Sequence, residues 1–143
     1  MATASDTRYQ SAAPVQLPPP VRYLLRVEGL AVAAVSAVLY ARTGASWWLF
    51  AALWLAPDLS MLGYLASPCR GARYYNAFHT YTLPVVLGLS GWLLHARGLI
   101  PFALVWINHI GVDRLLGYGL KYSTGFGWTH LGVKGKQTGA ASA

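Results

Sequence analysis

The stretch LIPFALVWINHIGVDRLLGYGLKY, residues 99–122, decides the fold class. It opens with a long apolar run, yet it contains His109, Asp113, Arg114 and Lys121. His109 and Asp113 are four residues apart, so in a helix they lie on one face. In a bilayer, a charged side chain turned toward lipid costs about 2.5 to 3.5 kcal/mol. We therefore expect a transmembrane helix whose polar face is turned toward other helices.

The composition of the whole chain supports a membrane protein. Of 143 residues, 55% are hydrophobic and only 10% are charged, against roughly 25% charged in ordinary soluble domains. Many of the six Trp and nine Tyr fall near the ends of apolar runs, as in an interfacial aromatic belt. The expected partner is the lipid bilayer. Nucleic acid is not expected despite the net charge of +7, because the basic residues are scattered singly.

Four apolar spans follow one another, each close to the ~20 residues that a bilayer requires. Connections as short as those between them make neighbouring helices antiparallel. The sequence therefore predicts an all-α fold with four transmembrane helices in an up-down bundle over residues 21–122. Residues 1–20 are expected to form a disordered cytoplasmic segment, and residues 123–143 a cytoplasmic tail. The expected spans cover residues 22–41, 46–66, 74–95 and 98–118.

The distribution of cations predicts the orientation. With four spans, both termini and the middle loop lie on one side of the membrane. The other side has only Arg42 and Arg97. The positive-inside rule then places both termini in the cytoplasm of a multi-pass protein of the cell (inner) membrane. The cations on the terminal side are Arg8, Arg22, Arg70, Arg73, Lys121, Lys134 and Lys136.

Each expected span also carries an ionisable residue in its cytoplasmic half. At ~1.5 Å per helical residue, Glu28 lies roughly 9 Å and Asp58 roughly 12 Å from the cytoplasmic ends of their spans. His79 and Asp113 lie about 8 Å deep, with His109 one turn deeper. This shared depth predicts that the side chains converge in the interior of the bundle.

Four residues are expected to be charge partners of this polar site: Arg26, Glu28, Arg114 and Lys121. The two arginines lie within the spans and can neutralise Glu28 or the aspartates. Lys121 is expected to extend to the lipid headgroups, or to contact an anionic lipid or substrate. Pro57 removes an amide donor directly before the aspartate of the second span, which predicts a kink near the site.

Asp58, His79, His109 and Asp113 together offer two imidazoles and two carboxylates. Divalent metals take such ligands from facing helices of a bundle. A metal with an open coordination position turns bound water into a nucleophile. One hypothesis is therefore a catalytic site that hydrolyses a lipid-linked or phosphorylated substrate, with His130 as a candidate fifth ligand.

Two alternatives use the same residues. Imidazoles and buried carboxylates can relay protons in a small proton- or ion-coupled transporter. Such a transporter would have to form a homo-oligomer, because four helices are few to enclose a pathway. In the other alternative, the polar residues only hold the helices in register. The spacing of the residues leaves all three interpretations open.

Several segments of the chain resemble a family of small bacterial membrane proteins, domain of unknown function 4260. The segments are LRVEG (25–29), PDLSMLGYL (57–65), YNAFHTYTLP (75–84), WINHIGVDRLLGYGLKY (106–122) and THLG (129–132). The resemblance covers about residues 22–132 and implies a polytopic membrane protein. It places Asp58, His79, His109, Asp113 and His130 in signature segments. The family pattern has an acidic residue before THLG, where this chain has Trp128.

A looser likeness concerns the order of the polar residues along the chain. Asp58 after a proline, His79 in the next span and the later His109/Asp113 pair are similar to the pattern of membrane-embedded metal-dependent hydrolases. This likeness favours a hydrolase over a transporter.

Overall fold

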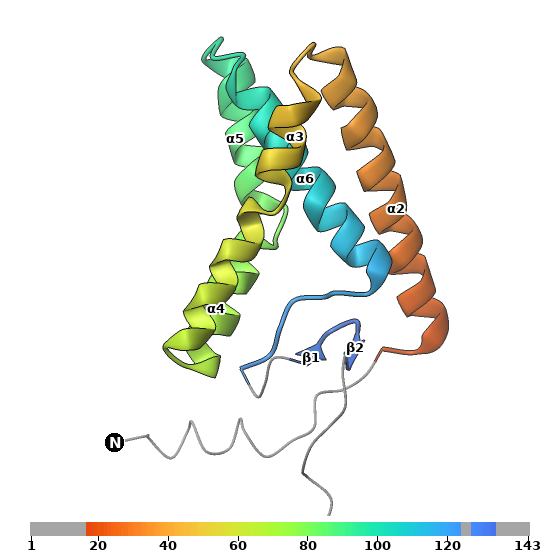
Figure 1. Ribbon diagram of the computed structural model, residues 1–143. Helices are drawn as coiled ribbons and strands as arrows, with labels where there is room; N and C mark the ends of the chain where they lie inside the picture. The colour runs from red at the N-terminus through yellow and green to blue at the C-terminus, as the bar shows by residue number, and fades with distance from the viewer. Residues whose placement is uncertain (1–16, 124–126, 134–143) are drawn as a thin grey trace, which may run out of the picture.

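The computed structural model describes residues 17–123 and 127–133, most of which are helical. Figure 1 shows the last part of α6 (Leu99–Leu116) beside α2 (Pro19–Arg42), with α4 (Pro68–Phe78) on the other side of the molecule. Two short strands lie between α4 and the beginning of α2. In chain order the elements are α2 (Pro19–Arg42), α3 (Trp47–Trp54), the 3₁₀ helix η1 (Ala56–Leu65), α4 (Pro68–Phe78), α5 (Thr82–Leu93), α6 (Leu99–Leu116), β1 (Trp128–Thr129) and β2 (Gly132–Val133).

Helices α2 and α6 match the first and fourth expected spans. Pro19 occupies the first turn of α2, where a missing N–H group is tolerated. Helix α6 ends at Gly117, whose φ of 85° gives a left-handed helix cap that glycine adopts without strain. Both helices are long and apolar enough to cross a membrane.

These two helices touch through glycines. A Cβ atom on Gly29 would lie only 2.7 Å from the carbonyl oxygen of Gly111. A Cβ atom on Gly111 would lie 2.9 Å from the backbone nitrogen of Ala33. Next to this contact, the side-chain amide of Asn108 donates to the Ala33 carbonyl at 2.7 Å and accepts from the Trp54 indole at 2.9 Å. Helix α6 is thus joined to both α2 and α3.

The second expected span is not one continuous α-helix. It consists of α3, whose first turn is capped by Ser46, and the 3₁₀ helix η1. Pro57 has no N–H group for the carbonyl one turn earlier. The next amide, that of Asp58, bonds to the Leu55 carbonyl three residues back at 3.1 Å. The predicted disruption at Pro57 is therefore present, and it changes the helix type.

The third expected span, residues 74–95, is corrected by the structure. It is divided into α4 and α5 at residues 79–81. A continuous helix would press the ring of Pro84 against the Thr80 carbonyl; instead, the Thr80 hydroxyl accepts from the Thr82 amide at 3.3 Å. Helix α4 also begins earlier than expected, because Ser67 caps it and Pro68 occupies its first turn.

Within the described residues, three helical segments are long and apolar enough to cross a membrane, rather than the four that were predicted. They are Pro19–Arg42, Trp47–Leu65 and Leu99–Leu116. Helix α5, with 12 residues, is only about 18 Å long at 1.5 Å per residue. Figure 1 shows α5 packed beside the first half of α6.

The chain after α6 folds back onto the helices. Strands β1 and β2 form a two-stranded antiparallel sheet, and Lys121 pairs with Thr129 in an isolated bridge. Thr129 and Leu131 are buried. This part of the predicted cytoplasmic tail is therefore a structured hairpin, which the all-α prediction did not include. Residues 1–16 of the segment expected to be disordered lie outside the described residues, as do residues 134–143 of the tail. The last part of that segment is a correction, because Pro19 and Pro20 form the first turn of α2.

Candidate metal centre

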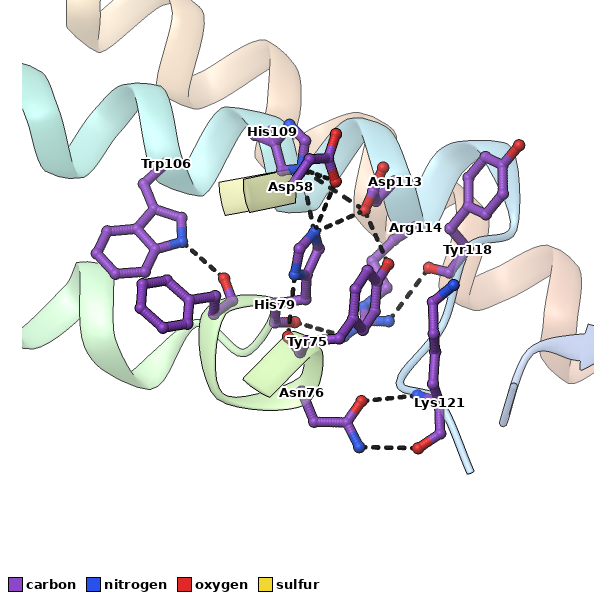
Figure 2. A network of polar contacts seen from close by, with 11 residues as sticks. Asp58, Tyr75, Asn76, His79, Trp106, His109, Asp113, Arg114, Tyr118 and Lys121 are labelled. Atoms are coloured by element: carbon purple, nitrogen blue, oxygen red, sulfur yellow. Dashed lines mark hydrogen bonds and ion pairs between the residues drawn. The ribbon is translucent and has the colours of Figure 1, made fainter. Parts of the chain in front are cut away.

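Three separate segments place the four candidate ligands. Asp58 lies in the first turn of η1, directly after the proline that changes the helix type. His79 is the residue at which α4 ends, and its backbone (φ −110°, ψ 21°) is no longer helical. His109 and Asp113 lie one turn apart on α6. Figure 2 shows the four side chains pointing toward one another.

The backbone at the end of α4 determines which nitrogen of His79 faces the site. The Nδ1 atom lies 3.0 Å from the Tyr75 carbonyl oxygen. A carbonyl can only accept a hydrogen bond, so Nδ1 carries the proton. In the neutral ring, Nε2 then presents a lone pair to the site. The Tyr75 ring stacks on the imidazole at a centroid distance of 3.7 Å and fixes its plane.

The two α6 ligands are held by contacts of different kinds. His109 is 1% exposed, and the edge of Trp54 packs against its ring at a centroid distance of 5.0 Å. Its Nδ1 atom is buried and has no hydrogen-bond partner among the described residues. Asp113 accepts a hydrogen bond from the Tyr75 hydroxyl at 3.2 Å, so Tyr75 contacts two of the four candidate ligands.

The facing atoms of the four side chains are close together. His79 Nε2 lies 3.2 Å from Asp58 Oδ1 and 3.5 Å from Asp113 Oδ2. His109 Nε2 lies 3.5 Å from Asp58 Oδ1 and 3.8 Å from Asp113 Oδ2. The two Nε2 atoms are 3.2 Å apart, and one donor atom from each residue lies within 4.8 Å of the others.

These spacings match the edges of a metal coordination sphere. Four N and O ligands at about 2.0 to 2.2 Å from a tetrahedral metal are about 3.3 to 3.6 Å from one another. Five of the six distances between the four ligand atoms run from 3.2 to 3.8 Å, and all six are within 4.8 Å. With carboxylate oxygens and an unprotonated imidazole nitrogen facing inward, the cluster needs a cation at its centre, either a proton or a metal ion.

Side chains of α6 also hold the broken end of α4. The Trp106 indole donates to the Phe78 carbonyl at 2.7 Å, and Arg114 Nη2 donates to the His79 carbonyl at 2.9 Å. These carbonyls belong to the last turn of a helix, where no intrahelical donor is available. The position of His79 is therefore set by α6, the same helix that carries His109 and Asp113 (Figure 2).

Comparison with known families identifies the family of the chain. Residues 22–133 match the model of the domain of unknown function (DUF4260). The chain belongs to the DUF4260 family. The match includes all four candidate ligands and the hairpin, and so confirms the family that the sequence motifs suggested. Comparisons with curated proteins and with solved structures returned no match.

Among the described residues, the two arginines expected to neutralise Glu28 or the aspartates form no ion pair with them in this DUF4260 protein. Arg26 donates to the carbonyls of Leu115 and Leu116 at 2.9 and 3.2 Å. Arg114 donates to carbonyls instead of a carboxylate, and Glu28 is exposed on α2. The arginines thus satisfy the free carbonyls at helix ends, a need that a count of charges does not reveal.

Lys121, the fourth expected charge partner, does not extend to the surface. It is 6% exposed, and its ammonium lies 4.5 Å from the centre of the Tyr75 ring. Asn76 holds its backbone through two hydrogen bonds of 2.7 and 2.8 Å. Burial lowers the pKa of Lys121 to about 8, although the nearby Asp113 and Asp58 favour the charged form.

His130 lies outside the four-residue cluster. Its Nδ1 accepts a hydrogen bond from the Leu120 amide at 2.8 Å, and its own amide bonds to the Leu120 carbonyl. In the structure, His130 thus fixes the hairpin to the end of α6. Sequence reasoning missed the roles of Tyr75 and Trp106. The four-residue spacing from Tyr75 to His79 was a usable signal, whereas nothing local marked Trp106 as a donor to α4.

Proposed function

We propose that this protein is an integral membrane protein that binds a divalent metal ion through Asp58, His79, His109 and Asp113. One observation carries the proposal: three chain segments bring two carboxylates and two imidazoles together, with the imidazole Nε2 atoms 3.2 to 3.8 Å from each other and from the carboxylate oxygens, and all four ligand atoms within 4.8 Å. Mixed imidazole and carboxylate ligands favour zinc and similar divalent transition metals.

Exposed apolar helices support the membrane location. Large apolar side chains such as Val27, Val38, Leu62 and Trp48 are each more than 60% exposed. Surfaces of this kind suit lipid, and the excess of cations at the termini and the middle loop favours a cytoplasmic location for both termini. The metal centre then lies in the cytoplasmic half, beside the end of α6. In this arrangement α4 and α5 together make a fourth, interrupted crossing between the spans Trp47–Leu65 and Leu99–Leu116, and the four crossings form an up-down bundle.

For the chemistry, we favour metal-dependent hydrolysis. The two imidazoles are 1% exposed, but the Asp58 side chain is 30% exposed, so the centre is open on that side. A bound divalent metal lowers the pKa of a coordinated water to about 7 and makes it a nucleophile. The Lys121 ammonium, beside Tyr75, favours a substrate with a negative charge.

An apolar cavity next to the centre supports a lipid-linked substrate. It has a volume of about 210 Å³ and is lined by Pro57, Phe78, Val105 and Trp106, among others. The first two residues directly precede the ligands Asp58 and His79 in the sequence. A hydrocarbon chain in this cavity would therefore lie close to the proposed metal site.

The metal content of the purified protein tests the proposal. The natural chain, the double variant His109→Ala/Asp113→Ala and a control, His95→Asn, are purified in detergent, supplied with zinc or manganese and freed of excess metal. We expect about one metal ion per chain in the natural and control proteins and none in the double variant. A natural chain without stoichiometric metal would remove the metal site and the hydrolase together.

The same proteins distinguish the other two interpretations. A transporter would give ion or proton flux in liposomes that is lost on Asp58→Asn. A purely structural network would lower thermal stability in these variants without any change in metal content. The proposed reaction would be supported if the natural chain hydrolyses phosphate esters or phospholipids only when metal is present and the double variant does not hydrolyse them.

A further inference from the structure

A second cavity lies at the end of the molecule where α2 begins and α6 ends. It has a volume of about 290 Å³. The three elements around it are separated in sequence, and the hairpin forms one wall. Its lining includes Arg22, Tyr23 and Arg26 of α2, Gly117 after α6, and Leu131 and Val133 of the hairpin. Asp58, His79, His109 and Asp113 do not line it, so it is distinct from the metal centre.

Arg26 is fixed in this cavity before any ligand arrives. Its guanidinium donates to the Leu115 and Leu116 carbonyls, which uses two of its five N–H groups. The guanidinium lies beside Gly117, where a Cβ atom would be 3.4 Å from Arg26 Nη2, an ordinary contact distance. A guanidinium held in this way loses little conformational entropy when it binds a second partner.

Arg22 supplies a second positive charge to the same space. It lies one helical turn before Arg26, and both side chains line the cavity. Among the described residues, no carboxylate lies within 4.0 Å of either guanidinium, since the ion pairs found there join only histidines and aspartates. The cavity therefore has two cations that the described chain does not neutralise.

We infer that this cavity binds the phosphate group of an anionic phospholipid. Paired guanidinium groups match the geometry of phosphate oxygens and form charge-assisted hydrogen bonds with them. A lipid fits better than free phosphate because the adjoining face of α2 is apolar and open: Tyr23, Leu24 and Val27 are 59 to 66% exposed. This face can hold the acyl chains while the headgroup occupies the cavity. The choice of a lipid over free phosphate rests on the proposed membrane location. The presence of the cavity and of its two arginines does not depend on that proposal.

Lipid titration of the full-length protein in a neutral detergent tests this inference. Phosphatidylglycerol, phosphatidylcholine and inorganic phosphate are added separately, and binding is followed by native mass spectrometry and by the melting temperature. The variants are Arg22→Gln and, as a matched control, Arg70→Gln, which removes an exposed cation from α4. Arg22→Gln leaves the Arg26 contacts intact and should preserve the fold, which circular dichroism checks.

We expect phosphatidylglycerol to bind the natural chain and Arg70→Gln equally well. Arg22→Gln should bind it roughly five- to tenfold more weakly, and Arg22→Lys should recover part of the loss. Equal binding by Arg22→Gln, or an equal loss in Arg70→Gln, overturns the inference. Equal stabilisation by inorganic phosphate overturns the choice of a lipid. Metal content is measured in parallel, so failure here is distinguishable from failure of the metal site.

Discussion

The α2–α6 pair and the end of α4 differ in the regularity of their backbones. Helices α2 and α6 are continuous and meet through Gly29 and Gly111, and Arg26 of α2 donates to the last carbonyls of α6. Helix α4 stops at His79, where the backbone turns away and the last carbonyls need donors from elsewhere. The continuous pair thus forms a rigid part of the fold. The interrupted helix α4 places His79 at its end, where the side chain can point toward the other candidate ligands.

The candidate ligands come both from a continuous helix and from places where a helix is interrupted. Two ligands on α6 have a fixed spacing because they share a helix face. The other two, Asp58 and His79, each lie where an α-helix stops. At the end of α4, the His79 side chain turns toward the site, while the last backbone carbonyls accept hydrogen bonds from Trp106 and Arg114 of α6. Substitutions in the two regions should therefore have different effects.

The largest effect should follow a change in the continuous pair. In Gly111→Val, the new side chain would overlap the backbone of Ala33 and Gly29, which lie 2.9 Å from the first added carbon. Because backbone cannot move aside cheaply, we expect a loss of about 3 kcal/mol or more in the free energy of unfolding. Thermal or denaturant unfolding in detergent measures it. Gly98→Ala is the control, since nothing lies within 4 Å of that site; equal stability of both variants would contradict the close helix contact.

A smaller and more selective effect is expected at the interrupted end. Tyr75→Phe keeps the ring that stacks on His79 but removes the hydroxyl that donates to Asp113. Loss of a hydrogen bond to a ligand typically lowers metal affinity about 10- to 100-fold, with the fold retained. Competition with a chelator measures the affinity. Tyr74→Phe, at an exposed neighbouring position, should bind like the natural chain, and identical affinities for both variants would argue against a role for the hydroxyl.

Trp106→Phe should have a modest effect on stability. It removes the indole N–H that donates to the Phe78 carbonyl and keeps an aromatic ring beside Phe78. We expect a loss of about 1 kcal/mol or somewhat more, because a helix-end carbonyl loses its donor. The exposed Trp92, changed to Phe, provides the comparison in the same unfolding assay. If the two variants unfold alike, the α4 end does not depend on this bond.

The smallest effect should be a pH dependence of the hairpin. Burial lowers the pKa of His130 below 6.5, and Arg114 adds to the shift. The unfolded segment therefore binds more protons just below about pH 6.5, so stability decreases as the pH falls through this range. Protonation also prevents Nδ1 from accepting the Leu120 amide.

Hydrogen exchange of the Leu120 amide, corrected for its intrinsic rate, measures this change between about pH 7.5 and about pH 5. Protection should decrease in the natural chain. In His130→Asn, an amide oxygen can accept the same bond without titrating, so its protection should stay constant. An unchanged natural chain would show that the ring does not titrate in this range.

Much of the scaffold could be predicted from sequence because its signals are local. Apolar length identifies α2 and α6, the four-residue spacing puts His109 and Asp113 on one face, and Pro57 marks an interruption. The break at His79 could not be placed in this way, because its cause, Pro84, lies inside the apolar run of the third span. The shared depth of the charged residues correctly brought the four candidate ligands together and wrongly included Glu28, since depth along a helix does not specify its facing direction.

The ligand set described above also imposes a rule on the charge of its occupant. Two ionised aspartates contribute two negative charges and two neutral imidazoles contribute none, so in the proposed metal site a dication would balance the charge of the four ligands themselves. A monovalent or trivalent ion would leave a net charge beside histidines that are 1% exposed, where an unbalanced charge carries a large desolvation cost. In the proposed site, the charge of the ligands would therefore favour divalent ions independently of their size or coordination preference.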